Sequence, residues 1–245
     1  MIYKTKGIVL KNIKYGETSL IVTAYTELFG LQTYIINGAR TSKSAGNKAA
    51  MFQPSAILEM EVYHNDQKEM QRIRECGWSF LYNNILSDVV KNCIALYMVE
   101  LLHKTLKQPE QNADLFYFCE DILIRLDSEA KNIAANFPLF FSLHLADFFG
   151  FKIDSHNIHK EEYFLDLKEG AFVAHQPTHP HFVDPGKAFI TAELLKMRVP
   201  MELEQLKLNQ QLRRDLLMKY QEYYALHIQD FGKMKTLPVL NEILG

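Results

Sequence analysis

The spacing of apolar residues divides the chain into two parts. Up to about residue 75, apolar and polar positions alternate, as Leu58, Met60 and Val62 do with Glu59 and Glu61, and this period is typical of half-buried strands. Runs rich in Ile, Val, Thr, Leu and Tyr predict strands at residues 5–12, 18–26, 31–36, 58–62 and 69–75, with turns at Gly16, Gly30, Asn37-Gly38 and His64-Asn65-Asp66. Five short strands predict a small closed barrel, because closure removes exposed sheet edges.

From Gly77 onward the period becomes helical. We expect two helices between residues 81 and 102, with Ser87 as the cap where they meet, and further helices at 114–126 and 208–228. A helix at 137–149 would start at Pro138 and close at Gly150, and another would begin at Thr191. Residues 151–190 lose the period. The second part therefore reads as a helical bundle with one irregular insert.

Composition narrows the class of protein. The 245 residues are 48% hydrophobic and 23% charged, which is typical of a folded globular chain. The three cysteines are widely spaced and lack a C-x-x-C pair, so a disulfide framework is not indicated and a reducing compartment is expected. No secretory signal opens the sequence, and the most apolar stretch, 137–151, is too short to span a bilayer. A cytoplasmic protein without membrane association is the expectation.

Charge is distributed unevenly. Residues 1–53 hold seven Lys and Arg against two Glu, a net charge of +5, whereas the whole chain has a net charge of -2. A basic first quarter on an acidic chain is the electrostatic footprint expected of a polyanion-binding domain, although a lysine-rich domain without such a ligand gives the same count. Beyond residue 79 the net charge is about -5, which favours a protein-binding surface over a DNA-binding one.

Residues 38–54 form a small, polar connector with three basic residues, Arg40, Lys43 and Lys48. Such a segment can contact phosphates through cations, hydroxyls and backbone N–H groups, or it can be an ordinary solvated loop. It is not a P-loop, because no glycine directly precedes Lys43. Tyr15 lies in a turn, where a nucleobase can stack on it, whereas Tyr3, Tyr25, Phe29 and Tyr34 are expected mainly inside the barrel.

Enzymatic and metal-binding signals are weak. His156 and His159 form an H-x-x-H pair, and His175 and His179 an H-x-x-x-H pair, but no cysteine lies nearby, and surface histidines are the preferred interpretation. No nucleophile elbow or Cys–His pair stands out. Glu59 and Glu61 are expected to be solvated residues of a half-buried strand. No metal, cofactor or catalytic residue is predicted.

The order of several motifs resembles the bacterial RecO family of recombination mediators. The residues that carry the resemblance are Gly7-Ile8-Val9-Leu10, Tyr15-Gly16-Glu17-Thr18-Ser19-Leu20-Ile21-Val22, Thr26-Glu27-Leu28-Phe29-Gly30, Gly38-Ala39-Arg40 with Lys43-Ser44, and Gln53-Pro54. Later matches are Phe137-Pro138-Leu139-Phe140 to Leu145, Phe149-Gly150-Phe151 and Lys235-Thr236-Leu237-Pro238-Val239-Leu240.

This resemblance implies an α+β protein: an N-terminal OB-fold β-barrel at residues 1–78, then an α-helical bundle domain at 79–245. It further implies binding of single- and double-stranded DNA, annealing of complementary strands, partnership with RecR and with the C-terminal tail of single-stranded DNA-binding protein, and indirect action on RecA, without turnover. Many members carry a four-cysteine zinc finger, whereas this chain has histidines at about 154–182, so we expect a finger-like insert without zinc.

The residues expected to bind DNA are the exposed cations of the first part and one aromatic. They are Lys11, Lys14, Arg40, Lys43 and Lys48 as phosphate contacts, Tyr15 as a stacking residue, and Arg72 and Arg74 as a lesser extension. Two other functions stay open: a metal-dependent nuclease on a barrel scaffold, and an adaptor that binds only protein. An acidic tail with an apolar end would need an apolar groove rimmed by cations, which the sequence does not locate.

Overall fold

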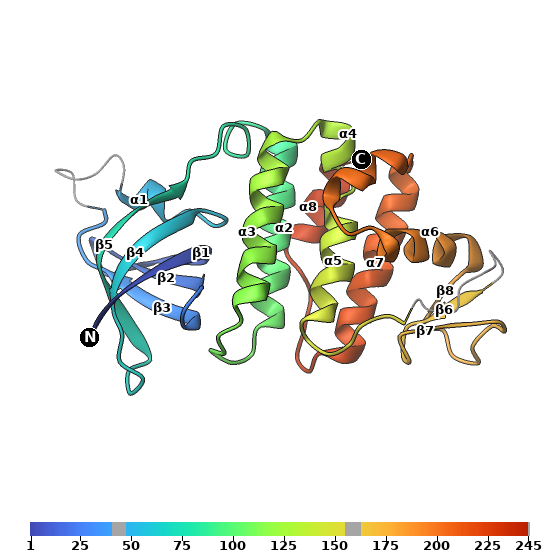
Figure 1. The fold of residues 1–245 in the computed structure, drawn as a ribbon, viewed down its shortest axis with the longest axis horizontal. Helices are drawn as coiled ribbons and strands as arrows, with labels where there is room; N and C mark the ends of the chain where they lie inside the picture. The colour runs from blue at the N-terminus through green and yellow to red at the C-terminus, as the bar shows by residue number, and fades with distance from the viewer. Residues whose placement is uncertain (41–47, 155–162, 245) are drawn as a thin grey trace. The chain divides into compact units, whose positions relative to one another are not determined.

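The computed structural model describes residues 1–40, 48–154 and 163–244 (Figure 1). The chain divides into two compact units, Met1–Ser87 with Leu102–Asp127, and Asp88–Leu101 with Ser128–Gly245. Each unit is described by itself below. The division of the chain into domains at residue 78 stays a prediction.

Five strands of the first unit close into a barrel, as the alternating pattern predicts. The strands are β1 (Ile2–Tyr15), β2 (Ser19–Thr26), β3 (Gly30–Ile36), β4 (Ile57–Tyr63) and β5 (Met70–Phe80). Their order is β1-β2-β3-β5-β4, with β3 and β5 parallel and β1 pairing with both β2 and β4. The predicted OB-like barrel and the mixed α+β class are therefore confirmed.

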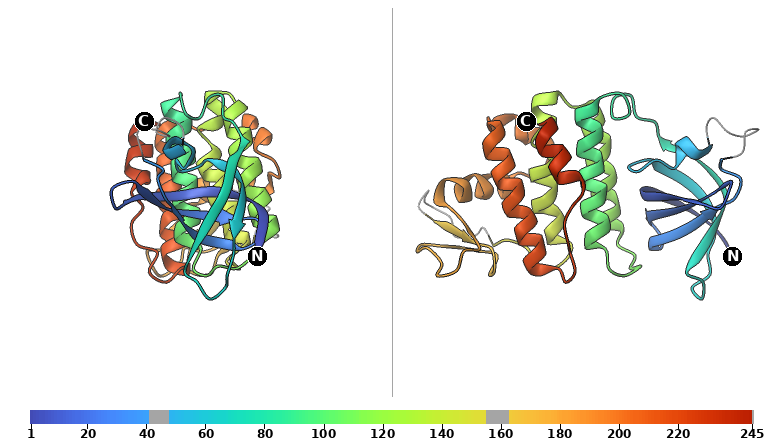
Figure 2. Two further views of the ribbon diagram at one scale, coloured as in Figure 1. Left: turned by 90° about the vertical axis from the view of Figure 1, so that its left-hand side faces the viewer. Right: turned by 180° about the vertical axis from the view of Figure 1, so that it is seen from behind.

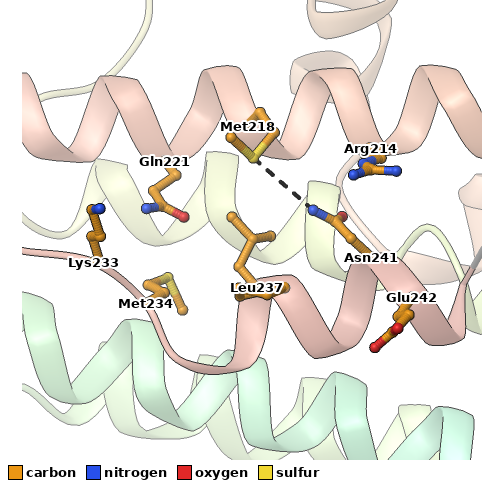
Figure 3. Close-up of a pocket in the computed structure, with 9 residues that line it drawn as sticks. Arg214, Met218, Gln221, Lys233, Met234, Leu237, Asn241 and Glu242 are labelled. Carbon is orange, nitrogen blue, oxygen red and sulfur yellow. Dashed lines mark hydrogen bonds between the residues drawn. The ribbon is translucent and has the colours of Figure 1, made fainter.

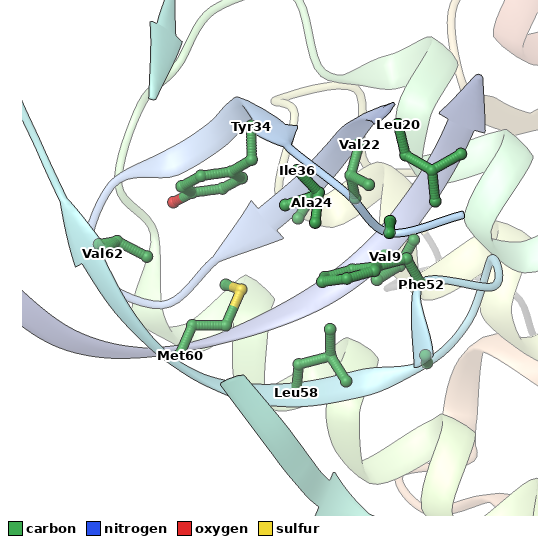
Figure 4. Packing of buried hydrophobic residues seen from close by; sticks show 12 residues of the cluster. Val9, Leu20, Val22, Ala24, Tyr34, Ile36, Phe52, Leu58, Met60 and Val62 are labelled. Carbon is green, nitrogen blue, oxygen red and sulfur yellow. The ribbon is translucent and has the colours of Figure 1, made fainter. Parts of the chain in front are cut away.

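The barrel interior is filled by aliphatic and aromatic side chains (Figure 4). Val9, Val22, Leu58 and Val62 are each 1% exposed or less. Gly7 has no side chain at the place where the methyl group of Met60 lies, since a Cβ there would be 2.4 Å from that methyl carbon. The short helix α1 (Lys48–Met51) leads to Phe52, which is fully buried in the same core and accepts a 2.6 Å hydrogen bond from Asn12 at its carbonyl oxygen.

A β-bulge in β1 changes which side chains face the core. The register with β2 shifts between Val9 and Lys11. Val9 points into the core, so strict alternation would also direct Lys11, Ile13 and Tyr15 inward. The extra residue reverses this parity, and Lys11 comes to lie opposite Thr23, on the outer side of the barrel.

One part of the outer wall is covered within the first unit. Helix α3 (Ala113–Ser128) lies against it, with the Lys6 ammonium 2.9 Å from Glu120 and the Tyr25 hydroxyl donating to the carbonyl oxygen of Asn112 at 3.0 Å. The predicted helix at 114–126 is thereby confirmed. This cover meets β1 near Lys6, so the outer face of the strand stays open at its beginning, where Ile2 is 47% exposed, and again from Lys11 onward.

The prediction of a helix from residue 81, capped by Ser87, is wrong. β5 continues to Phe80, and residues 83–85 direct their backbone N–H groups to the buried carboxylate of Asp127 at 2.8–2.9 Å. Those N–H groups are therefore satisfied without a helix. Helix α2 (Val89–Thr105) starts later, and its cap is Asp88, whose carboxylate accepts from Val90 and Lys91.

The second unit is a set of packed helices (Figure 2). With the first part of α2 it contains α4 (Lys131–Ala134), α5 (Phe137–Asp147), α6 (Pro185–Lys196), the 3-10 helix η1 (Pro200–Gln205), α7 (Gln210–His227) and α8 (Thr236–Ile243). α5, the most apolar of these, packs against α6 and α7. Pro138 lies in its first turn, and Gly150 follows its end with a φ of 80°.

The predicted irregular insert contains a small sheet in the order β7-β6-β8. Its strands are β6 (Phe164–Asp166), β7 (Ala171–Val173) and β8 (Phe182–Val183). The cap predicted at Thr191 is wrong, because α6 begins at Pro185 and Thr191 is buried inside it, 2.8 Å from the Tyr220 hydroxyl. None of the helices in the described part of the chain is both long and apolar enough to cross a membrane.

Candidate functional site

A row of outward-pointing side chains crosses the five strands of the barrel, in the order β1, β2, β3, β5 and β4. The register pairs Ile13 with Ile21, Ile21 with Ile35, Ile35 with Arg72, and Arg72 with Tyr63. Residues that are direct partners lie on the same face of a sheet. We call this row the outer ladder: Ile13, Ile21, Ile35, Arg72 and Tyr63. Lys11 lies beside it, in the parallel row with Thr23, Thr33 and Met70.

Two cations predicted to contact phosphate, Lys11 on β1 and Arg72 on β5, therefore both point outward from the barrel. Both side chains are exposed. Among the residues that the structure describes, neither has a carboxylate within ion-pairing distance. An exposed cation without an acidic partner keeps its full charge available to a polyanion.

The end of the β1–β2 hairpin gathers three more of the predicted residues. Lys14 and Tyr15 are exposed, and Tyr15 is 50% exposed, as expected for a turn aromatic. The backbone N–H of Arg40 donates to the carbonyl oxygen of Thr18 at 2.9 Å. The guanidinium of Arg40 lies 3.5 Å from the carbonyl oxygen of Gly16. These contacts hold Arg40 beside the hairpin end, although more than twenty residues separate it from Tyr15 in sequence. We call Lys14, Tyr15 and Arg40 the hairpin end.

The remaining predicted cations differ in their surroundings. Arg74 lies 3.5 Å from Glu61, which also pairs with Lys4, so a neighbouring carboxylate offsets part of its charge. Lys6, which contributed to the basic count of the first quarter, pairs with Glu120. Lys43 lies outside the described residues, and so does the side chain of Lys48.

The prediction of interior aromatic residues is met in part: Tyr34 lies in the barrel core with Phe29 packed against that core, whereas Tyr25 points outward and is buried against Phe116 of α3, so the prediction is wrong for Tyr25. Tyr25 and Tyr34 are fully buried, and burial raises the pKa of both phenols. Phe29 stacks on His64 with ring centroids 3.8 Å apart, and Tyr3 meets Phe29 edge-on. Tyr3 is still 36% exposed.

Sequence reasoning missed the apolar part of the outer ladder. Ile13 is 46% exposed and Tyr63 is 47% exposed. For Tyr63 the sequence did hold a signal. Leu58, Met60 and Val62 point inward, so alternation assigns Tyr63, the residue after Val62, to the outward set. For Ile13 no such signal existed, since the bulge that turns it outward leaves no mark in the alternation.

The second unit contains a groove of different chemistry between α7 and α8 (Figure 3). Its volume is about 590 Å³. Met218, Met234 and Leu237 line it, with Arg214 and Lys233 at its edges and Glu242 at the α8 side. The start of α8 is fixed by Glu100 of α2, whose carboxylate accepts from the backbone N–H groups of Lys235 and Thr236 at 2.8 Å each. We call this feature the α7–α8 groove.

The histidine pairs assemble no metal site in the part of the chain that the structure describes. His156 and His159 lie outside that part, His175 is exposed, and His179 is only partly exposed because it contacts Asp166 at 3.2 Å. Within the described ranges, no three His, Cys, Asp or Glu side chains lie close enough together to hold a metal ion. None of the three cysteines forms a disulfide bond.

Comparisons with known proteins cover nearly the whole chain. The family model for the recombination protein O N terminal region matches residues 1–82, and that for its C terminal region matches residues 86–237. Proteins named DNA repair protein RecO are 32% identical over 243 residues in Azobacteroides pseudotrichonymphae and 33% identical over 244 residues in Bacteroides fragilis, with 99% of each chain covered. The one from Christiangramia forsetii is 34% identical over 248 residues, with full coverage of both. The chain belongs to the RecO family.

Proposed function

We propose that this chain is a non-enzymatic DNA-binding mediator of recombination in DNA repair. It binds single- and double-stranded DNA through the barrel, anneals complementary strands, and acts with RecR to help load RecA on DNA coated by single-stranded DNA-binding protein, in a RecF-type pathway. Its relatives are named DNA repair proteins. The working compartment is the bacterial cytoplasm, at the nucleoid.

The observation that carries the proposal is the outward position of Lys11 and Arg72, two exposed cations without a carboxylate partner among the described residues. The outer sheet face and the hairpin loops are also where OB-folds bind oligonucleotides. The hairpin end, with Lys14 and Arg40, adds two more phosphate contacts. Lys43 and Lys48 extend this set in the proposal, with Arg74 as a weaker contributor because it pairs with Glu61.

Annealing needs no covalent step in this arrangement. Cations that neutralise phosphates release condensed counterions and reduce the repulsion between two strands. Holding two strands on one chain also raises the effective concentration of each for the other. The apolar members of the outer ladder, Ile13, Ile21 and Ile35, have no side-chain hydrogen-bond donor or acceptor that would read a base edge, so they add no hydrogen-bonded sequence readout.

The α7–α8 groove fits the acidic C-terminal tail of single-stranded DNA-binding protein. Met218, Met234 and Leu237 offer apolar contacts for the end of such a tail, and Arg214 and Lys233 can pair with its carboxylates. RecR enters the proposal as the partner that the family resemblance implies.

A salt titration of DNA binding tests the proposal. Affinity for a labelled oligonucleotide should fall steeply as salt rises, and Arg40→Ala with Lys43→Ala should reduce the magnitude of the log–log slope by about 1 to 2. Annealing of complementary oligonucleotides, bare and coated with single-stranded DNA-binding protein, should be accelerated by wild type and less by the variant. Absence of DNA binding at low salt would instead favour a protein-binding adaptor.

The nuclease alternative has its own test. Incubation of labelled DNA with Mg²⁺ or Mn²⁺ should leave the strands intact under the proposal, whereas cleavage that co-purifies with the protein would favour a phosphodiesterase. Metal analysis of protein without a histidine tag should give substoichiometric zinc. One equivalent per chain that His156→Ala with His175→Ala removes would contradict the expected metal-free insert.

A further inference from the structure

The barrel has an open pocket where the outer ladder meets the β4–β5 hairpin. Its volume is about 1010 Å³, and its lining includes Tyr3, Tyr63, Lys68, Met70 and Arg72. None of the DNA contacts inferred above explains the aromatic residues of this pocket. We propose that it holds one unstacked nucleobase of a single strand, with Tyr63 as the stacking face and Arg72 on the adjoining phosphate. This inference rests on the proposed function, since it requires that the barrel bind DNA.

The relative position of Tyr63 and Arg72 carries the inference. They are direct partners across β4 and β5, so their side chains leave the sheet from the same face at neighbouring points. Tyr63 is 47% exposed, which leaves a large part of its surface available. An aromatic ring next to an exposed guanidinium is the pairing that single-strand binding requires, since one group stacks on the base and the other neutralises the phosphate beside it.

The loop beyond Tyr63 is held rigid from inside. The side chain of Gln71, which is 3% exposed, accepts from the backbone N–H of Asn65 at 3.0 Å and donates to the carbonyl oxygens of Asn65 and Lys68 at 2.9 and 2.7 Å. The Asn65 side chain accepts in turn from the N–H of Gln67 at 2.9 Å. A pocket wall fixed in this way loses little conformational entropy when a ligand binds.

Charge on the two sides of the pocket sets the path of the strand. Asp66 lies 2.8 Å from His64, and its side chain is 94% exposed, so a phosphate on that side would meet an exposed carboxylate. Lys68 and Arg72 carry the positive charge of the pocket. The sugar-phosphate chain therefore passes on the Arg72 side, which continues into the rest of the outer ladder toward Ile35.

Selectivity for single strands follows from this arrangement. In a duplex both faces of each base are stacked on neighbouring base pairs, so Tyr63 has no free base face to contact, whereas Arg72 still reaches a phosphate. Tyr63 therefore contributes to single-strand affinity alone, and Arg72 contributes to both kinds of DNA.

The test measures binding of a thymine oligonucleotide, a duplex of the same length and an abasic strand of that length to four proteins. They are wild type, Tyr63→Ala, Tyr63→Leu and Tyr63→Phe. Both the Ala and the Leu variant should lose about 5- to 100-fold in affinity for the thymine strand. Their duplex affinity and the slope of single-strand affinity with salt should be unchanged, and Tyr63→Phe should bind as wild type does. Wild type should bind the abasic strand no more tightly than Tyr63→Ala binds the thymine strand.

Matched controls separate this contact from general effects. Leu86→Ala removes another exposed apolar side chain of the same unit, 49% exposed, and should bind as wild type does. Arg72→Ala should weaken both kinds of DNA and reduce the salt slope. Equal losses of single- and double-strand affinity in Tyr63→Ala, or no loss at all, overturn the base pocket while leaving the proposed function intact. Wild type that binds no DNA at low salt overturns the proposed function, and the pocket with it.

Discussion

The outer ladder of the barrel and the α7–α8 groove offer two different kinds of contact. The ladder and the neighbouring Lys11 join cations and aliphatic residues on paired strands, with Lys11 and Arg72 free of acidic partners among the described residues. The groove is lined by Met218, Met234 and Leu237 between two helices, with Arg214 and Lys233 at its edges. Attraction between charges weakens as salt rises, whereas burial of apolar area does not. Salt should therefore weaken binding at the barrel more steeply than binding in the groove, where part of the affinity is apolar.

They also differ in how the sequence holds them in place. A bulge and four strand pairings fix the ladder, so exchanging one exposed side chain should leave the rest unchanged. The groove depends on the position of the short helix α8, whose first N–H groups are held by Glu100. Substitutions on the exposed rim of the groove are therefore better probes than truncation of its buried Leu237.

The largest effect should follow from reversing the charge of Arg72 in the ladder and of Lys11 beside it. Lys11→Glu with Arg72→Glu removes two phosphate contacts and adds repulsion, so DNA affinity at low salt should fall on the order of 100-fold. Fluorescence anisotropy with a labelled oligonucleotide measures it. Lys168→Glu with Lys207→Glu, two exposed lysines of the second unit, makes the same change in net charge and should have a much smaller effect. Comparable losses in the two double variants would show that only net charge matters.

A smaller effect is expected from a charge in the groove. Met218 is 52% exposed at the groove, and Met218→Glu should lower affinity for an acidic peptide with an apolar end about 10-fold, through lost burial and repulsion. DNA affinity should change far less. Met201→Glu supplies the control, because Met201 is 58% exposed on η1 and does not line the groove. Isothermal titration with both variants decides, and equal peptide affinities would place the tail elsewhere.

The sequence predicted the fold better than it predicted the site. Alternation and turn glycines located all five strands, because period and turn chemistry are local properties. The failures at Ser87 and Thr191 arose where a distant partner satisfied the local chain. Asp127 binds the backbone of residues 83–85, and Tyr220 takes the hydroxyl of Thr191 into the core. No local pattern carries that information.

The candidate site shows the same division. The charge count of the first quarter selected Lys11, and the strand pattern selected Arg72, but Lys6 and Arg74 looked equivalent until Glu120 and Glu61 were found beside them. The outward position of Lys11 depends on the bulge in β1, and the place of Arg72 beside Ile35 depends on the parallel pairing of β3 with β5, both of which are long-range features. Tyr63 could have been assigned to that face from alternation alone.

The smallest expected effect is on the pH dependence of stability, which His144 should give to the second unit but not to the first. Burial is the main cause that lowers the pKa of His144 on α5, against the opposing effects of Asp147 and of a hydrogen bond to the carbonyl oxygen of Leu194. The unfolded state then binds a proton more readily than the folded state does. Stability should be independent of this group well above pH 6.5 and should fall as pH drops through that value.

His144→Gln keeps a hydrogen-bond donor for Leu194 but does not titrate. The free energy of unfolding of this variant, measured by circular dichroism, should therefore fall less steeply between pH 8 and pH 5 than that of wild type. The only tryptophan, Trp78, packs against the barrel core and reports the first unit by fluorescence. Its transition should have the same pH dependence in both proteins, because the substitution lies in the other unit. If the unfolding free energies of the two proteins fell equally with pH, protonation of His144 would cost the folded state nothing. The contrast between the two units would then rest on ligand chemistry alone.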